Sequence, residues 1–269
     1  MRDVGGLPTV DGRRTRSGVL VRADNLQGLT ERDVARLVGE LGVRSVIDLR
    51  TDGERRLEGP TPLDAAGVVA HGLSLVPERP EDSAEQAVDR AVGVAVDPEA
   101  PVGGFDRAIP RPERRGRARN DMAGYYVGYV EDAPDNLARA LRLLADPASG
   151  PTVVHCAAGK DRTGTVVALA LSLAGVTRDA VVADYVASAE RVEAVLARLR
   201  ASPTYARDLE GATADDVRPV AASMEGFLDQ VDQAYGGPHG LALAIGVDEE
   251  TVERLVRRLV GPSPHGAPG

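Results

Sequence analysis

The stretch Thr152-Val-Val-His-Cys-Ala-Ala-Gly-Lys-Asp-Arg-Thr-Gly164 decides how this sequence folds and where it acts. Its first residues, 152–155, form an apolar run typical of a short buried strand, and the long apolar segment after Gly164 predicts a helix. The residues between them therefore connect the carboxyl end of a strand to the amino end of a helix. Ligands of open α/β sheets bind at such connections, so this loop is the first candidate for a functional site.

Two side chains that occur only once in the chain both lie in this loop. Cys156 is the only cysteine and Lys160 is the only lysine, so 31 of the 32 basic residues are arginine. A single cysteine excludes an intrachain disulfide and favours a reducing compartment. Because arginine is so common here, a cysteine followed six positions later by Arg162 arises by chance about one time in nine. The spacing therefore needs support from its context.

The composition excludes several classes of protein. With 43% hydrophobic residues among 269, the chain can bury enough surface for one large core or two small ones. A net charge of −9 argues against a general nucleic-acid binder, which needs a basic surface. Four scattered histidines and one cysteine argue against a metal site, and no cofactor is expected. The oligomeric state stays open.

No segment of the sequence resembles a membrane anchor or a signal. Residues 1–16 lack the apolar core of a signal peptide. The longest apolar run, 166–176, is far shorter than the ~20 residues of a membrane span. We therefore expect a cytoplasmic protein without an integral membrane segment, and secretion without a recognisable signal stays open.

Strand and helix patterns alternate on both sides of the loop. After the cap Thr30, apolar residues at helical spacing predict a helix that Gly42 ends. Such alternation predicts an α/β fold with a parallel sheet. The other predicted strands are 18–22, 43–49 and 68–75, and the other predicted helices are 135–144, one beginning at Thr177, 191–200, 224–235 and 249–260.

Residues 1–260 are expected to form a single domain, because no position separates two cores. Residues 77–120 interrupt the pattern with six prolines and with six arginines between Arg107 and Arg119. Two interpretations stay open for this segment: a solvated insertion, or a lid that recognises an anionic substrate. Residues 261–269, rich in Gly and Pro, are expected to form a flexible tail.

The loop has the properties of an anion site. The backbone N–H groups of Ala157, Ala158 and Gly159 would point inward, beside the positive end of the helix dipole. Lys160 adds charge, and Arg162 can bind two phosphate oxygens with its planar guanidinium. A nucleotide-binding Walker A loop is excluded, because it requires Ser or Thr after the lysine and a glycine five positions before Gly159.

A cysteine inside an anion site indicates nucleophilic chemistry. The helix terminus and the two cations would favour the thiolate form of Cys156, which is the nucleophile. Thr163 can donate its hydroxyl to the sulfur. This arrangement is typical of an enzyme that forms a phosphocysteine intermediate. The alternative, a buried cysteine that serves only as a small apolar side chain, is less consistent with this loop.

The segment His155–Gly164 resembles the signature loop of the cysteine-dependent protein tyrosine phosphatases. Its adjacent Lys160 and Asp161 are similar to those of the atypical bacterial members of that family. The resemblance implies an α/β fold with a central, mostly parallel sheet of about four to five strands flanked by many helices. Upstream segments follow the same order as in that group, namely 2–6, 16–22, 26–30, 46–50 and Glu54.

The resemblance also implies roles for the loop residues. Cys156 would be the nucleophile and Arg162 the phosphate clamp. The chain has no tryptophan and so lacks the Trp-Pro-Asp loop of the classical enzymes. Resemblance to the atypical group implies that Asp161 is the general acid, with Asp48 as the reserve candidate. Asp161 could instead form only a structural ion pair with an arginine.

Residues next to the loop are expected to support it. His155 would orient the loop, or else be an ordinary core histidine. Glu54 and Arg50 could hold Arg162 in place, or else be two surface charges near the end of a strand. The sequence alone does not decide between the two interpretations of His155, or between the two interpretations of Glu54 and Arg50.

Phosphate esters are the expected substrates. The resemblance implies activity on phosphotyrosine proteins and on phosphoinositides, because Lys160 would add charge for a second phosphate. The alternatives are a dedicated lipid or inositol phosphate phosphatase and a pseudophosphatase that binds phosphotyrosine without hydrolysing it. A sulfurtransferase also uses a cysteine loop, but Asp161 and the Arg-Thr-Gly continuation fit it poorly.

Overall fold

A five-stranded sheet forms the centre of the molecule. The computed structural model describes residues 1–77, 122–207 and 209–260. The strands are β1 (Arg2–Asp3), β2 (Leu20–Ala23), β3 (Ser45–Asp48), β4 (Val69–Gly72) and β5 (Thr152–His155). They lie in the order β1-β2-β5-β3-β4, with β1 antiparallel to β2 and all other neighbours parallel. The predicted α/β class with a mostly parallel sheet is confirmed.

The central position of β5 determines where the loop lies. β5 pairs with β2 on one side and β3 on the other, and His155 lies beside both Ala23 and Asp48. The carboxyl ends of three parallel strands therefore meet at one edge. Val153 packs on one face of the sheet and Val154 on the other, as strand alternation requires.

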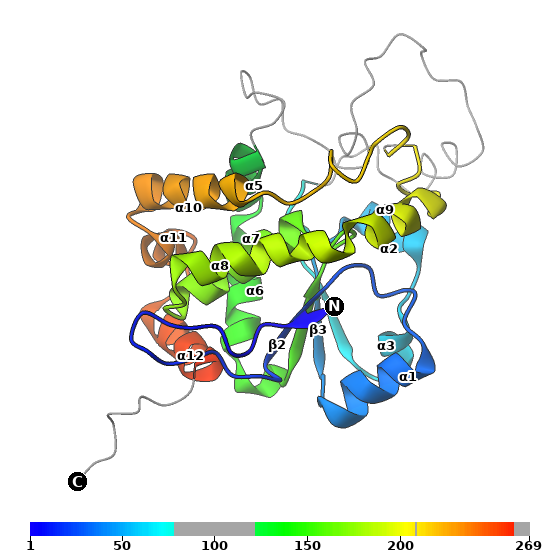
Figure 1. Cartoon of the computed structure of the whole chain (residues 1–269). Helices are drawn as coiled ribbons and strands as arrows, with labels where there is room; N and C mark the ends of the chain where they lie inside the picture. The colour runs from blue at the N-terminus through cyan, green and yellow to red at the C-terminus, as the bar shows by residue number, and fades with distance from the viewer. Residues whose placement is uncertain (78–121, 208, 261–269) are drawn as a thin grey trace.

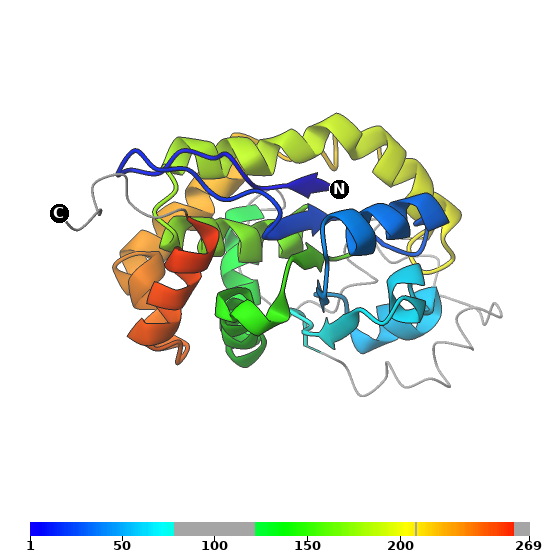
Figure 2. The same ribbon diagram turned by 90° about the horizontal axis from the view of Figure 1, so that it is seen from below.

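Helices cover both faces of the sheet (Figure 2). One face carries a thin layer that includes α1, the π-helical turn after it, and α3, and the other carries a thick layer centred on α7. The bounds are α1 (Glu31–Val34), the π-helical turn (Ala35–Glu40), α2 (Asp52–Glu58), α3 (Pro62–Ala65), α5 (Met122–Asp132), α6 (Pro134–Ala145), α7 (Asp161–Leu173), α8 (Arg178–Val186), α9 (Val192–Ala201), α10 (Ala221–Tyr235), α11 (Pro238–Ala244) and α12 (Glu249–Leu259), with short 3-10 turns at Pro147–Ser149 and Ala187–Arg191.

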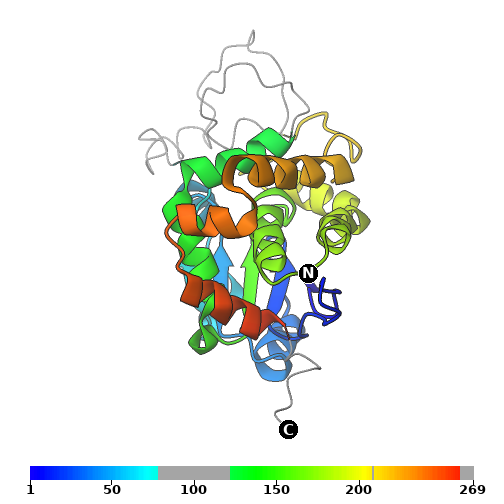
Figure 3. The ribbon, with the colours of Figure 1, turned by 90° about the vertical axis from the view of Figure 1, so that its left-hand side faces the viewer.

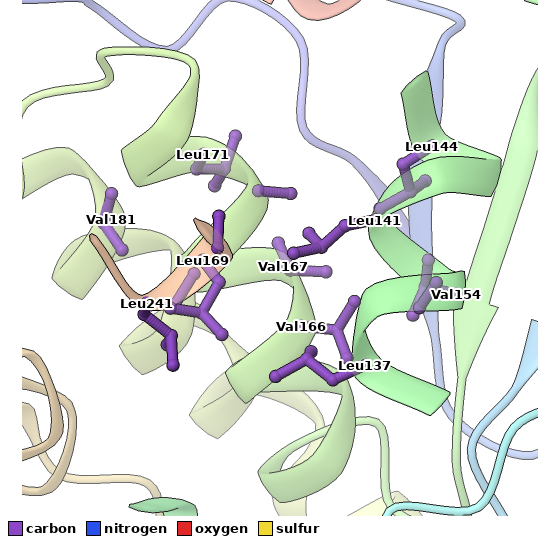
Figure 4. Close-up of a cluster of buried hydrophobic side chains, with 14 of the residues drawn as sticks. Leu137, Leu141, Leu144, Val154, Val166, Val167, Leu169, Leu171, Val181 and Leu241 are labelled. Atoms are coloured by element: carbon purple, nitrogen blue, oxygen red, sulfur yellow. The ribbon is translucent and has the colours of Figure 1, made fainter. Parts of the chain in front are cut away.

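The apolar helix α7 is the centre of the larger core. Val166, Val167 and Leu169 pack among side chains of α6, α8 and α11, as Figure 4 shows. Figures 1 and 3 show α10 lying against α5. Met224 of α10 and Tyr185 of α8 lie beside Gly164 in the first turn of α7. This packing fixes the first turn of α7, and so fixes the loop that precedes it.

Several elements differ from the sequence prediction. The segment 52–58 is a helix, which we did not predict although Thr51 and Glu54 form a complete capping box there. Residues Met122–Asp132, where we predicted no element, form helix α5. The predicted insertion or lid at 77–120 and the tail at 261–269 lie outside the described residues, apart from Pro77. Among the described helices, none is both long and apolar enough to span a membrane.

Truncation of Leu169 should destabilise the whole domain. Leu169 is 1% exposed in the core around α7, so Leu169→Ala removes buried surface and leaves a cavity. We expect a loss of about 2–5 kcal/mol in the free energy of unfolding, measured by urea denaturation. The matched control is Leu57→Ala on α2, where the side chain is 50% exposed and the expected change is within about 0.5 kcal/mol. Equal effects of the two substitutions would contradict this account of the core.

Candidate active site

The loop between β5 and α7 is closed by bonds at both of its ends. The N–H of Leu49 donates to the carbonyl of His155 at 2.9 Å, and the N–H of Gly164 donates to the carbonyl of Lys160 at 2.8 Å. Lys160 occupies the N-cap position of α7, and Asp161 is the first residue of that helix. Cys156 lies at the start of the loop and is only 2% exposed.

The carbonyl oxygens of the loop are bonded from outside. The carbonyl of Ala157 accepts from Nη2 of Arg198 at 2.9 Å and from the backbone N–H of Asn25 at 3.2 Å. The carbonyl of Gly159 accepts from Nη2 of Arg22 at 2.9 Å. Arg22 is itself held by the carboxylate of Asp184. The carbonyl of Ala157 shares its peptide unit with the N–H of Ala158, and the carbonyl of Gly159 shares its unit with the N–H of Lys160. Because the N–H and C=O of one unit point in opposite directions, these bonds direct both N–H groups away from Arg198, Asn25 and Arg22.

Three N–H groups of the loop are open to a ligand within the described structure. Those of Ala157, Ala158 and Gly159 donate to none of the described residues. The first N–H groups of α7 have no partner within the helix either, as at any helix start. The structure therefore places the predicted phosphate-binding residues 157–160 directly before α7 and Thr163 in its first turn, the arrangement expected of an anion site at the positive end of a helix dipole.

Gly159 is required by the geometry of the loop. Its φ is +65°, in the left-handed region that favours glycine. A Cβ there would lie 2.6 Å from the carbonyl oxygen of Ala23 and 2.7 Å from the N atom of Asp24. The loop thus packs directly on the backbone that follows β2, which a larger residue would prevent.

Arg162 is held from behind by Glu54. Its Nη1 lies 2.6 Å from Oε2 of Glu54, its Nη2 lies 2.8 Å from Oε1, and Nη1 also donates to the carbonyl of Leu49 at 3.1 Å. These bonds use three of the five N–H groups of the guanidinium. The two left over, on Nε and Nη2, lie along one edge of the plane. That edge can bind two oxygens of a phosphate.

Two further bonds position the carboxylate of Glu54. The backbone N–H of Thr51 donates to Oε2 at 2.8 Å, and the hydroxyl of Tyr205 donates to Oε1 at 3.0 Å. Burial alone would raise the pKa of Glu54, but the charge and hydrogen bonds of Arg162 outweigh it and hold this pKa below its usual value. The open choice for Glu54 is therefore resolved in this structure in favour of a buried partner of Arg162.

Asp48 belongs to a different charge cluster. Its carboxylate accepts two bonds from Nε and Nη2 of Arg50, at 3.0 and 2.7 Å, and lies 3.4 Å from Nε2 of His155. Burial opposes ionisation, but His155 and Arg50 together hold the pKa of Asp48 well below its usual value. A carboxyl group that stays ionised has no proton to give, so the geometry speaks against Asp48 as the general acid. Arg50 supports Asp48 and not Arg162.

His155 connects this cluster to the loop. It is fully buried, and its Nδ1 lies 3.3 Å from the carbonyl oxygen of Cys156 while its Nε2 faces Asp48. These contacts fit the expectation that His155 orients the loop.

Asp161 lies at the start of α7 with one oxygen already bonded. The hydroxyl of Tyr126 donates to Oδ1 of Asp161 at 2.7 Å, and Nζ of Lys160 lies 3.4 Å from the same oxygen. Lys160 also donates to the carbonyl of Val217 at 2.9 Å. The lysine thus connects the loop to the segment before α10.

Thr163 differs from the prediction. Its hydroxyl is completely buried and forms no hydrogen bond with any described residue. Within the described part of the chain, the predicted bond to the sulfur of Cys156 is therefore absent, and the Thr163 hydroxyl, in the first turn of α7, has no partner.

Sequence reasoning missed four residues of this site: Arg22, Tyr126, Arg198 and Tyr205. Each reaches the loop or its partners from a distant part of the chain. In a chain with 31 arginines no local signal marks two of them. Among the described residues, no cluster of His, Cys, Asp or Glu could hold a metal ion.

Comparisons with known proteins agree on one family. A model of the tyrosine phosphatase family matches residues 1–261. The chain is 30% identical to the triple specificity protein phosphatase PtpB of Mycobacterium tuberculosis, over 97% of this chain and 96% of that protein. It is 30% identical to a putative tyrosine-protein phosphatase of Cupriavidus necator (71% of this chain, 60% of that protein) and to a tyrosine-protein phosphatase of Nostoc commune (50% and 47%).

Removal of the Glu54 charge should destabilise the fold in a pH-dependent way. Glu54→Gln leaves Arg162 buried without its counter-ion, so we expect a loss of about 3 kcal/mol in the free energy of unfolding at pH 7. The folded-state pKa of Glu54 lies below its ordinary value of 4.5. Its contribution is therefore complete above about pH 4.5 and decreases as the pH falls below that value.

Urea denaturation of the wild type and of Glu54→Gln, at pH 7 and at about pH 4, measures how their difference in unfolding free energy depends on pH. The matched control is Glu253→Gln, because Glu253 forms an exposed ion pair with Arg257 at 3.2 Å and should contribute at most about 1 kcal/mol. A stability difference between wild type and Glu54→Gln that stays constant down to pH 4 would contradict the proposed ion pair.

Proposed function

The chain belongs to the tyrosine phosphatase family, and we propose from this premise that it hydrolyses phosphate monoesters through a phosphocysteine on Cys156. The observation that carries the proposal is the edge of Arg162, formed by Nε and Nη2, that has two N–H groups without a partner among the described residues. Glu54 and Leu49 occupy the other N–H groups of the guanidinium, which leaves two donors directed to a single ligand. The N–H groups of residues 157–159 supply further donors.

The reaction follows from these groups in two steps. The thiolate of Cys156 attacks phosphorus, the S–P bond forms, and the P–O bond to the leaving group breaks with its electron pair on oxygen. Arg162 and the loop N–H groups stabilise the charge on the remaining phosphate oxygens. Water then attacks phosphorus, and the S–P bond breaks to restore the thiolate.

Asp161 is proposed as the group that moves the proton. In the first step it protonates the leaving oxygen, and in the second its carboxylate accepts a proton from the attacking water. Two observations support Asp161 over Asp48. Asp161 lies in the loop itself, whereas both oxygens of Asp48 are bonded to Arg50.

Phosphotyrosine proteins are the proposed substrates, with phosphoinositides as a second class. The similarity to a protein named a triple specificity phosphatase supports a site that accepts more than one kind of phosphate ester. The buried nucleophile, the clamp and the acid form a complete set, which favours an enzyme over a binding-only pseudophosphatase. We propose that the enzyme acts in the reducing cytosol, because oxidation of its single thiol would stop the reaction.

Substitution of Cys156 tests the enzyme directly. We expect Cys156→Ser to reduce hydrolysis of an aryl phosphate and of a phosphotyrosine peptide to background, because a serine hydroxyl is not ionised at pH 7. Vanadate should inhibit the wild-type enzyme competitively, because it can accept hydrogen bonds from the same N–H groups as the substrate phosphate. Hydrolysis that survives Cys156→Ser would place the nucleophile elsewhere.

The contribution of Lys160 tests the substrate class. If Lys160 provides charge for a second phosphate, Lys160→Ala should lower kcat/KM on a short-chain phosphoinositide about tenfold more than on a phosphotyrosine peptide. Arg257→Ala, a charge removal on an exposed side chain of α12, is the matched control and should affect neither substrate. An equal loss on both substrates would show that Lys160 does not select multiply phosphorylated substrates.

A further inference from the structure

A chain of three hydrogen-bonded groups leads from the helical layer into the loop. Tyr185 of α8, Tyr126 of α5 and Asp161 of α7 lie in series, with 2.7 Å between the two phenol oxygens and 2.7 Å from Tyr126 to Oδ1 of Asp161. Tyr126 is fully buried and Tyr185 is 2% exposed. None of the reactions described above uses either phenol.

The direction of these bonds is fixed by the number of protons. A phenol has one proton to donate, and Tyr126 donates it to Asp161. Tyr185 must therefore donate to the oxygen of Tyr126. Burial and the neighbouring Asp161 carboxylate raise the pKa of Tyr126 well above its usual value, and burial also raises that of Tyr185. Both phenols consequently keep their protons at neutral pH.

Aromatic packing holds Tyr126 in one orientation. Its ring contacts Tyr129 of the same helix at a centroid distance of 6.1 Å, Tyr185 at 6.0 Å and Phe227 of α10 at 6.1 Å. The contacts with Tyr185 and Phe227 are edge-to-face, a favourable arrangement for aromatic rings. Since α5 packs closely on α10, the hydroxyl of Tyr126 has little freedom to leave Asp161.

We propose that Tyr126 is a positioning residue that directs the acid proton of Asp161 to the leaving group, by occupying Oδ1 so that Oδ2 carries the proton. Lys160 lies near the same oxygen, Oδ1, at 3.4 Å. No described residue forms a hydrogen bond with Oδ2. This inference rests on the proposed role of Asp161 as the general acid.

Tyr126 itself gains and loses no proton in the reaction. As the S–P bond forms and the P–O bond breaks, the leaving oxygen keeps the electron pair and takes the proton from Oδ2. Asp161 is then a carboxylate, and the bond from Tyr126 to Oδ1 becomes a stronger, charge-assisted one. The phenol therefore stabilises the products of proton transfer more than the reactants, which accelerates this step.

The test compares two substrates that differ in their need for an acid. Phenyl phosphate releases a poor leaving group that must be protonated, whereas 4-nitrophenyl phosphate releases a good one. We expect Tyr126→Phe to lower kcat/KM on phenyl phosphate about tenfold more than on 4-nitrophenyl phosphate. The ratio kcat/KM is used because it reports the steps up to P–O cleavage.

Two control variants separate positioning from general damage. Tyr205→Phe removes the buried phenol that donates to Glu54, the partner of Arg162. It should therefore weaken the phosphate clamp and lower kcat/KM on both substrates by the same factor. Tyr185→Phe leaves the bond from Tyr126 to Asp161 intact, and should produce a smaller change in the same direction as Tyr126→Phe. If Tyr126→Phe does not fold, the preference of Tyr185→Phe between the two substrates decides the question.

A double-mutant cycle with Asp161→Asn distinguishes this inference from the proposed function. Asp161→Asn alone should lower kcat/KM on phenyl phosphate by about a hundredfold more than on 4-nitrophenyl phosphate. In that background Tyr126→Phe should change the substrate ratio no further. No substrate preference in Asp161→Asn would overturn Asp161 as the acid. A preference in Asp161→Asn together with none in Tyr126→Phe, or an additive effect in the double variant, would overturn the role of Tyr126 alone.

Discussion

The carbonyl oxygens of Ala157 and Gly159 are bonded on the outer side of the loop by Arg198, Asn25 and Arg22, and this constraint underlies the rest of the site. A short loop between a strand and a helix could direct its peptide units either way. With these carbonyls fixed, the N–H groups of Ala158 and Lys160 are directed to the opposite side, where we propose that the loop binds an anion beside Cys156. In this proposal, phosphate binding and the nucleophilic role of Cys156 have the same structural cause.

Buried ion pairs hold this loop in place from several directions. Arg162 pairs with Glu54, Arg22 with Asp184, and Arg50 with Asp48, and all six side chains are at least nine-tenths buried. Such pairs contribute little net stability, because the desolvation of the charges offsets their attraction. Their effect here is to fix the orientation of each guanidinium. The overall charge of −9 therefore has little bearing on the substrate, which would meet the oriented guanidinium of Arg162 and the N–H groups of the loop.

The sequence predicted the parts of the structure that depend on local pattern. The apolar run before Cys156 predicted strand β5, and the apolar run after Gly164 predicted helix α7. Thr30 is the N-cap of helix α1, as expected. The supporting residues could not be predicted in the same way. Tyr126 and Tyr205 reach Asp161 and Glu54 across 35 and 151 positions of sequence, contacts that only the packing of α5 and of the segment after α9 creates. The sequence left Asp48 as a candidate acid, because its bonds to Arg50 become visible only in the folded chain.

The most direct test of the account is to trap the phosphorylated enzyme. Asp161→Asn should slow the release of phosphate from Cys156 once a good leaving group has departed, so that the intermediate accumulates. The enzyme is mixed with 4-nitrophenyl phosphate, quenched in acid within milliseconds, digested and examined by mass spectrometry. The account predicts a phosphoryl group on the peptide that contains Cys156 and an initial burst of nitrophenol equal to the enzyme concentration. A phosphoryl group on another residue, or turnover without any phosphorylated peptide, would contradict it.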